Sequence, residues 1–136
     1  MKQLFTLIIA TIALTLTACN KETSTTQTEV MNNMLTNKNW YLDYSITDGT
    51  TRSYVGQSTY FVTYLKDGST RDSDGLVGNY TIEIANNQSE IHVQVKTSNG
   101  NALEVIYTIV SVGDSKLVLS KQETKGSPTQ LYFSNK

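Results

Sequence analysis

The sequence predicts an all-β protein: a single small antiparallel up-and-down β-barrel of about eight strands, preceded by a signal peptide and a flexible tether. Three observations lead to this prediction. Short segments in which apolar and polar residues alternate recur from residue 40 to the C-terminus. Turn-forming pairs such as Asp67-Gly68, Asn86-Asn87 and Asn99-Gly100 separate these segments. Val, Ile, Thr and Tyr are frequent, with one Pro in 136 residues, a composition that suits pleated sheets.

Residues 1–18 have the parts of a secretory signal peptide. Lys2 supplies a positive start, and residues 4–14 form an apolar stretch. A membrane-spanning helix needs about 20 apolar residues, so this segment is too short to be a permanent span. Residues 16–19, Leu-Thr-Ala-Cys, resemble the bacterial lipobox. The resemblance implies cleavage before Cys19 and lipidation of its sulfur; the alternative is ordinary secretory cleavage that leaves a free thiol.

Residues 19–36 are predicted to be the lipidated cysteine and a disordered tether, because they are polar and show no long periodicity. At most, residues 30–35 form one short helical turn. Residues 37–136 are predicted to be the barrel domain. Asn20-Lys21-Glu22 partly resembles the surface-export signal of Bacteroidetes lipoproteins. We therefore expect a lipid-anchored protein of the cell envelope, at the outer membrane, with the periplasmic and surface faces both open.

The elements follow from alternation. The predicted strands are, in order, residues 40–46, 59–66, 69–74, 79–85, 90–97, 103–112, 116–121 and 130–134. The first would place on one face Trp40, Leu42, Tyr44 and Ile46. In residues 103–112, Ile106 and Val110 occupy the second face, which indicates cover on both sides. An open sheet would leave two exposed edges, and closure into a barrel removes them.

Four segments resemble one family in order and spacing. Residues 35–40 look like the lipocalin-like start, in which a Gly-x-Trp element opens the first strand. Tyr64 to Gly68 resembles the aromatic-x-x-Asp-Gly hairpin, Gly78 to Tyr80 the Gly-x-Tyr strand entry, and residues 107–119 the closing hairpin. Together they resemble the small lipocalin-like lipoproteins of Bacteroidetes. The chain departs from the pattern at Asn37 and Lys38, where the opening glycine would stand, and it lacks the lipocalin C-terminal helix and disulfide.

The chemistry-bearing residues predict no enzyme, metal site or cofactor. His92 is the one histidine and should face outward, so a zinc site lacks ligands. Asp67, Asp72 and Asp74 do not have the spacing of a calcium loop. No catalytic carboxylate pair and no phosphate-binding loop is visible. The formal net charge of −1, without a basic run, argues against a nucleic-acid partner.

Five aromatic residues are the candidates for lining one cavity: Trp40, Tyr60, Tyr64, Tyr80 and Tyr107. Such a cavity would bind a small hydrophobic ligand at the envelope. The alternative is that they pack as a filled core. In that case the protein would be an interaction module, such as an inhibitor or immunity-type lipoprotein, that meets an envelope protein partner through exposed loops at residues 47–55 and 66–77.

Overall fold

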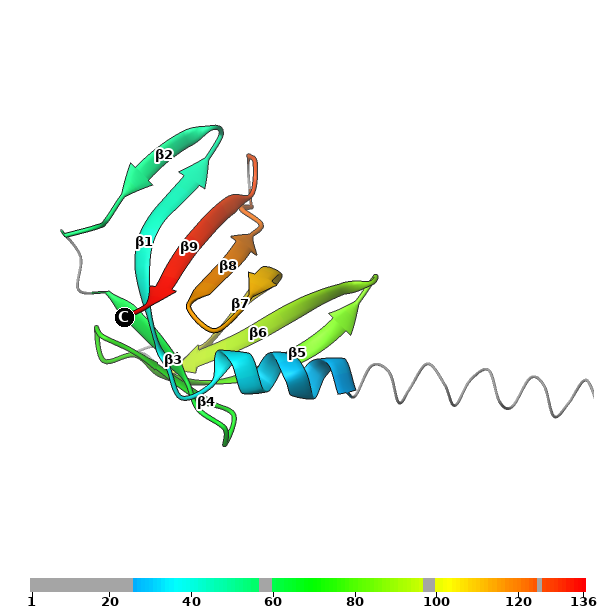
Figure 1. Cartoon of the computed structure of the whole chain (residues 1–136). Coiled ribbons are helices and arrows are strands. Elements are labelled where there is room, and N and C mark those ends of the chain that lie inside the picture. Colours follow the sequence, from blue (N-terminus) through cyan, green and yellow to red (C-terminus); the bar gives the residue numbers. More distant parts are fainter. Residues whose placement is uncertain (1–25, 57–59, 97–99, 125) are drawn as a thin grey trace, which may run out of the picture.

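The computed structural model describes residues 26–56, 60–96, 100–124 and 126–136 (Figure 1). Within them, a helix over residues 26–35 precedes the strands. The strands are β1 (Asn39–Thr47), β2 (Thr50–Ser53), β3 (Phe61–Tyr64), β4 (Ser69–Asp72), β5 (Val77–Ala85), β6 (Gln88–Lys96), β7 (Ala102–Val112), β8 (Lys116–Lys121) and β9 (Thr129–Asn135). The predicted signal peptide, Cys19, residues 20–25 of the predicted tether and Asn99 of the predicted Asn99-Gly100 turn lie outside the described residues.

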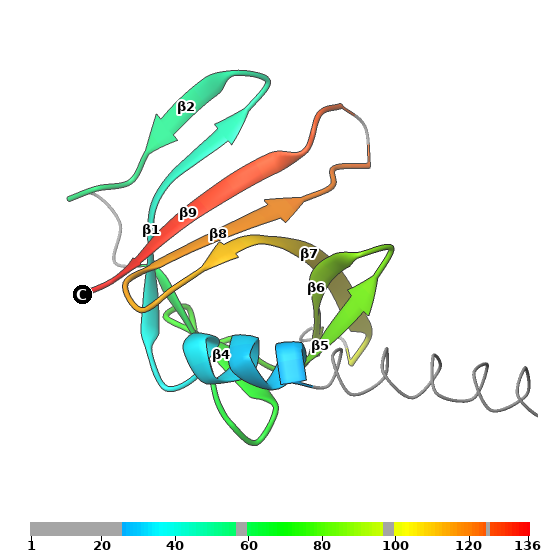
Figure 2. The same cartoon turned by 45° about the vertical axis from the view of Figure 1, so that its right-hand side comes forward.

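Eight of the described strands close into an antiparallel ring. From β3 to β9 each strand pairs with the next, and β1 pairs with β3 on one side and β9 on the other (Figure 2). The predicted all-β up-and-down barrel is therefore confirmed. Closure leaves β3 to β9 without a full-length free edge, which removes the aggregation hazard of an open sheet.

β2 is an extra strand outside the ring, and the residue pattern did not predict it. It pairs only with the second half of β1, and the β1–β2 hairpin extends beyond the rest of the barrel (Figures 1 and 2). Asp48 and Gly49 both have positive φ, 51° and 72°, as a two-residue hairpin turn requires. All four β2 side chains are exposed, so no apolar alternation marked this strand in the sequence.

A β-bulge in β1 reverses which side chains face the interior. Leu42 pairs with Phe133, but the register shifts by one residue before Tyr44, which pairs with Tyr132. These two tyrosine rings stack on the outer face with centroids 4.3 Å apart, while the buried Ser45 takes the inner position. The predicted common face of Trp40, Leu42, Tyr44 and Ile46 is therefore wrong beyond Leu42, because one inserted residue flips all that follow.

A second bulge, in β7, keeps Ile109 and Val112 on the inner face and leaves Val110 between them. Val110 is 54% exposed and Ile106 is 44% exposed. The expectation that this strand is covered on both sides is wrong. β7 has one buried face, like its neighbours.

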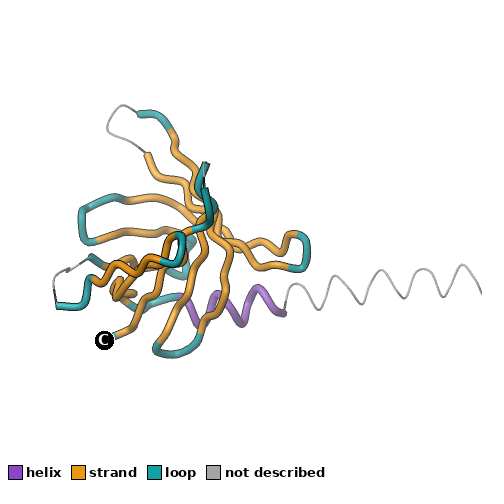
Figure 3. Tube along the Cα trace, turned by 90° about the horizontal axis from the view of Figure 1, so that it is seen from above, coloured by secondary structure: helices purple, strands orange, loops and turns teal. Residues whose placement is uncertain are grey.

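The helix over residues 26–35 corrects the tether prediction. Leu35 is 1% exposed and belongs to the core, so residues 26–36 are part of the folded unit and not a disordered linker. Met31, Met34 and Leu35 recur at helical spacing. The pairing of β6 with β7 ends at Thr108, and the helix lies along the rest of β7, to one side of the strands in Figure 3.

The barrel has one apolar core. Its buried apolar members are Leu35, Trp40, Tyr64, Tyr80, Ile91, Leu117, Leu119 and Phe133. Ile82 and Val93 pack against them, which confirms the predicted inward faces of β5 and β6.

Candidate functional site

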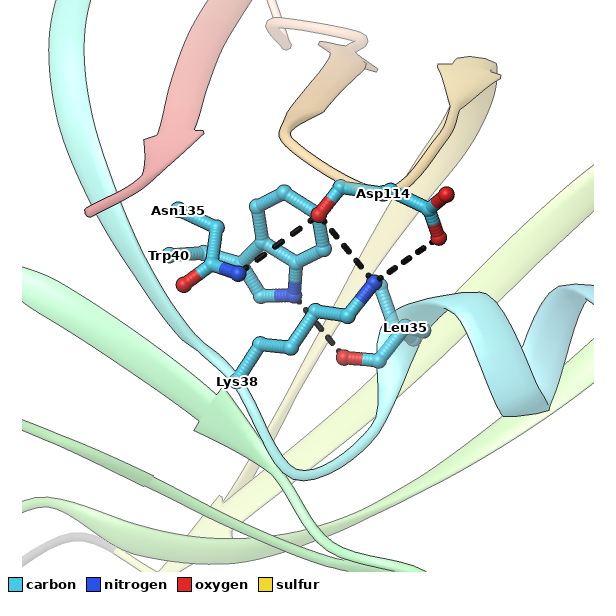
Figure 4. Close-up of polar contacts among 5 residues, drawn as sticks. All are labelled: Leu35, Lys38, Trp40, Asp114 and Asn135. Carbon is cyan, nitrogen blue, oxygen red and sulfur yellow. Dashed lines mark hydrogen bonds and ion pairs between the residues drawn. The ribbon is translucent and has the colours of Figure 1, made fainter.

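One end of the barrel is closed by Trp40. Its side chain is fully buried, and its Nε1–H donates to the Leu35 carbonyl oxygen at 2.8 Å, which ties the end of the helix to β1 (Figure 4). Over the ring, the Lys38 ammonium lies 3.6 Å from an Asp114 carboxylate oxygen and also donates to the Asp114 main-chain carbonyl at 3.2 Å. The turn between β7 and β8 is thus held against the start of β1.

Two tyrosines reinforce this closed end. The Tyr80 hydroxyl contacts the Asn32 side chain at 2.7 Å and the Leu65 carbonyl oxygen at 2.9 Å, so it joins the helix to the β3–β4 turn. The Tyr64 ring meets the Tyr80 ring edge-on, with centroids 5.0 Å apart. Burial raises the pKa of Tyr80 to about 12, with a smaller contribution from the Asp67 charge.

Above the closed end the interior contains a cavity of about 230 Å³. The residues around it come from seven of the eight ring strands, from Tyr60 just before β3 and from the loop after β4. They are Leu42, Tyr60, Val62, Tyr64, Thr70, Arg71, Asp72, Leu76, Val93, Val95, Leu103, Val105, Tyr107, Leu119, Leu131 and Phe133. Pockets for drug-sized ligands usually measure roughly 300–1,000 Å³, so this cavity suits a smaller molecule.

The structure divides the five predicted site residues between the two ends, with Tyr64 shared by both. Tyr60, Tyr64 and Tyr107 line the cavity, from β3 and its approach and from β7. Trp40 and Tyr80 do not border it, because they pack in the closed end below. The sequence could not separate the two groups, since all five lie at inward positions of the predicted strands.

The cavity tyrosines lie in a desolvated setting. Burial raises the pKa of Tyr60 to about 12, helped by the charges of Asp72 and Asp74 and by a hydrogen bond to Asp72. Burial also raises the pKa of Tyr64 and of Tyr107, which keeps both phenols neutral. They can act as hydrogen-bond donors, and their rings offer apolar surface to a ligand.

Thr70 and Asp72 also border the cavity, and the residue pattern did not predict them as site residues. Both lie in β4, whose Ser-Thr-Arg-Asp sequence shows no apolar alternation. The register places them inside, because Thr70 pairs with Tyr64 and Asp72 with Val62. The available signal was the spacing of the two residues in the segment that follows the Asp67-Gly68 turn. Thr70 and Asp72 lie two positions apart, so in a strand they share one face.

His92 faces outward from β6, as predicted, but it is not freely solvated. Its Nε2 lies 3.3 Å from a Glu90 carboxylate oxygen, and its Nδ1 lies 3.5 Å from a Glu104 carboxylate oxygen. Its side chain is 19% exposed. Among the described residues, no group of three His, Cys, Asp or Glu side chains comes together in a way that could hold a metal ion.

A second hollow is an open apolar groove beside the helix. It lies between the helix and the end of β7, has a volume of about 680 Å³ and is lined by Met31, Met34 and residues 109–112 among others. It is larger than the interior cavity but shallow and open to solvent. The interior cavity is the candidate site because side chains surround it and because it contains polar groups that could orient a ligand.

Fold and site together define a small antiparallel barrel that is closed at one end and contains a small interior cavity. No protein-family model matches the chain, and no curated protein matches it. Among solved structures it is similar to a lipocalin-like protein from Bacteroides uniformis. The likeness covers 76% of this chain and 99% of that one, with a TM-score of 0.54 and 21% sequence identity. At this identity the comparison establishes the fold, which is lipocalin-like.

Among the described residues, no helix is both long enough and apolar enough to cross a membrane.

Proposed function

We propose that this protein is a lipid-anchored lipoprotein of the bacterial cell envelope whose barrel binds a small hydrophobic ligand. The observation that carries the binding proposal is the interior cavity of about 230 Å³, with mainly aliphatic and tyrosine side chains around it. An engineered apolar cavity of about 150 Å³ binds benzene, so this volume is sufficient for a ligand of one ring with a short side chain. The fold supports the proposal because small lipocalin-like barrels hold one small ligand.

Filling the cavity tests the binding proposal. Val93 lines the cavity, and Val93→Phe would place a ring in the space that a ligand needs. Native mass spectrometry of the purified full chain should find a co-purifying small molecule, and Val93→Phe should lose it. Ile106→Phe is the matched control, because Ile106 is exposed on the outer face of β7 and borders neither the cavity nor the groove beside the helix. If neither the parent chain nor the control carries a ligand, the binding proposal fails.

The anchoring proposal is supported by the sequence around Cys19. Two acyl chains give stable membrane attachment, because each buried methylene group contributes about 0.8 kcal/mol. Growth with labelled palmitate should label the parent chain and not Cys19→Ala, and Cys19→Ala should leave the membrane fraction. An unlabelled parent chain would refute the anchor. Protease accessibility of intact cells would then assign the periplasmic or surface face.

A second candidate function is binding of a protein partner. It is favoured by three exposed apolar side chains on or beside the loops predicted for this role: Val55, Leu76 and Val77. Isolated exposed apolar residues are common, so this observation is weaker than the cavity. Val77→Asp should abolish capture of an envelope partner if this function holds, whereas Val93→Phe should leave capture unchanged.

A further inference from the structure

The register of β4 places one carboxylate on the inner wall of the cavity. Asp72 pairs with Val62, and Thr70 pairs with Tyr64. Directly opposed residues of antiparallel strands share a face, and Val62 and Tyr64 both face the core. Asp72 therefore faces inward at the end of β4, and it borders the cavity.

The Asp72 carboxylate is held in place. Its Oδ1 accepts the main-chain N–H groups of Asp74 at 3.0 Å and Leu76 at 2.9 Å, across the loop that follows β4. The Tyr60 hydroxyl donates a hydrogen bond to the same carboxylate. A charge held by three donors is preorganised, so a ligand would meet it without a cost in side-chain ordering.

Three tyrosine rings accompany this carboxylate. Tyr60, Tyr64 and Tyr107 all border the cavity, and their hydroxyls are close enough that each pair influences the pKa of at least one member. Aromatic faces carry partial negative charge and attract cations. The cavity thus combines one anionic group with several aromatic rings, a combination typical of sites for organic ammonium ions.

Among the described residues around the cavity, Arg71 is the one basic residue, and its side chain does not neutralise the Asp72 charge from inside the cavity. Arg71 is exposed and pairs across the sheet with Val77, which is 65% exposed, so both point to the outer face. An anion that borders an apolar cavity favours a positively charged ligand and disfavours a carboxylate.

We propose that the cavity selects a small apolar molecule that carries one protonated amine. The ammonium group lies against the Asp72 carboxylate, and the hydrocarbon part lies among the tyrosine rings and the aliphatic side chains of β6 and β7. This inference rests on the proposed function, because it names the ligand class of the same cavity.

Three probes of similar size and different charge test this selectivity: 2-phenylethylamine, 2-phenylethanol and phenylacetate. Each is titrated into the full chain in lipid nanodiscs, with empty nanodiscs as the blank. We expect the amine to bind on the order of tenfold more tightly than the alcohol, and phenylacetate to bind most weakly. Equal or tighter binding of the alcohol or phenylacetate would overturn the amine inference and leave the binding proposal standing.

Asp72→Asn removes the charge and retains an oxygen that can accept the loop N–H groups. It should reduce amine binding to the level of the alcohol and leave alcohol binding unchanged. Asp74→Asn is the matched control, because it removes the same charge in the same loop from a residue that does not border the cavity. It should keep most of the amine preference. An unchanged preference in Asp72→Asn overturns the inference, and no binding of any probe, together with no co-purifying ligand, overturns the proposed function as well.

Discussion

The two ends of the barrel are formed by the same strands but differ in how completely their interiors are packed. At the closed end, Trp40, Leu35 and Leu117 are almost fully buried, and the helix is tied to β1 by a buried hydrogen bond. At the cavity end, some inward residues such as Val93 and Tyr107 are only partly buried, polar groups face inward, and space remains. The difference teaches that stability and binding are separated along the barrel axis. We expect substitutions below the cavity to cost folding free energy and substitutions around it to change ligand binding.

The largest effect should come from Trp40→Ala. Removing this fully buried side chain leaves a void and breaks the bond to the Leu35 carbonyl, so the free energy of unfolding should fall by about 3–5 kcal/mol. Urea unfolding followed by circular dichroism measures this. Trp40→Phe should cost less, roughly 1–3 kcal/mol, because it chiefly leaves the carbonyl unpaired. A loss below that range in Trp40→Ala would contradict the role of this end as the stabilising one.

Two matched substitutions at inward positions of β6 compare the two ends directly. Ile91 and Val93 face the same interior, but Ile91 is fully buried and Val93 borders the cavity. Ile91→Phe should destabilise by about 1–3 kcal/mol through overpacking, whereas Val93→Phe should cost less because its ring enters empty space. Thermal unfolding of both variants is the measurement. If Val93→Phe is as damaging as Ile91→Phe, the interior is filled in solution.

Alkaline pH should weaken the closed end. The pKa of Tyr80 is about 12 and that of Tyr64 is also raised, against a usual value of 10.0. Above pH 10 the unfolded chain loses these protons and the folded protein keeps them. The stabilisation is therefore complete below pH 10 and declines above it, and the share of Tyr80 is lost as the pH approaches 12. The slope is up to about 1.4 kcal/mol per pH unit per tyrosine. Tyr64→Phe should show a shallower decline in urea unfolding, and an unchanged slope would contradict this account.

The smallest effect should come from Asp114→Ala. The Asp114 side chain is fully exposed, and ion pairs at such positions contribute little. The main-chain carbonyl of residue 114 still accepts from Lys38 in the variant. Thermal unfolding should therefore show no measurable change at moderate salt. A clear loss would mean that the ion pair, and not the buried packing beneath it, holds the β7–β8 turn.

The alternation of residues was sufficient to predict most of the barrel. Segments such as residues 79–85 and 90–97 carry an apolar side chain at every second position, and their inward faces are as predicted. Asn86 and Asn87 both have positive φ, which a two-residue turn demands and asparagine tolerates. For the candidate site, the prediction located all three tyrosines that line the cavity and could not distinguish them from Trp40 and Tyr80.

By itself, the sequence determined the order of the eight ring strands, most of the turns and the apolar core, because side-chain alternation and turn chemistry are local properties of the chain. The tertiary structure decided the rest. It set the two bulges, of which the one in β1 exchanges Tyr44 for Ser45 on the inner face, and it ordered residues 26–35 against β7. It also brought Asp72 to the cavity wall. Each of these depends on how distant strands meet and how completely side chains fill the space between them, which no local pattern encodes.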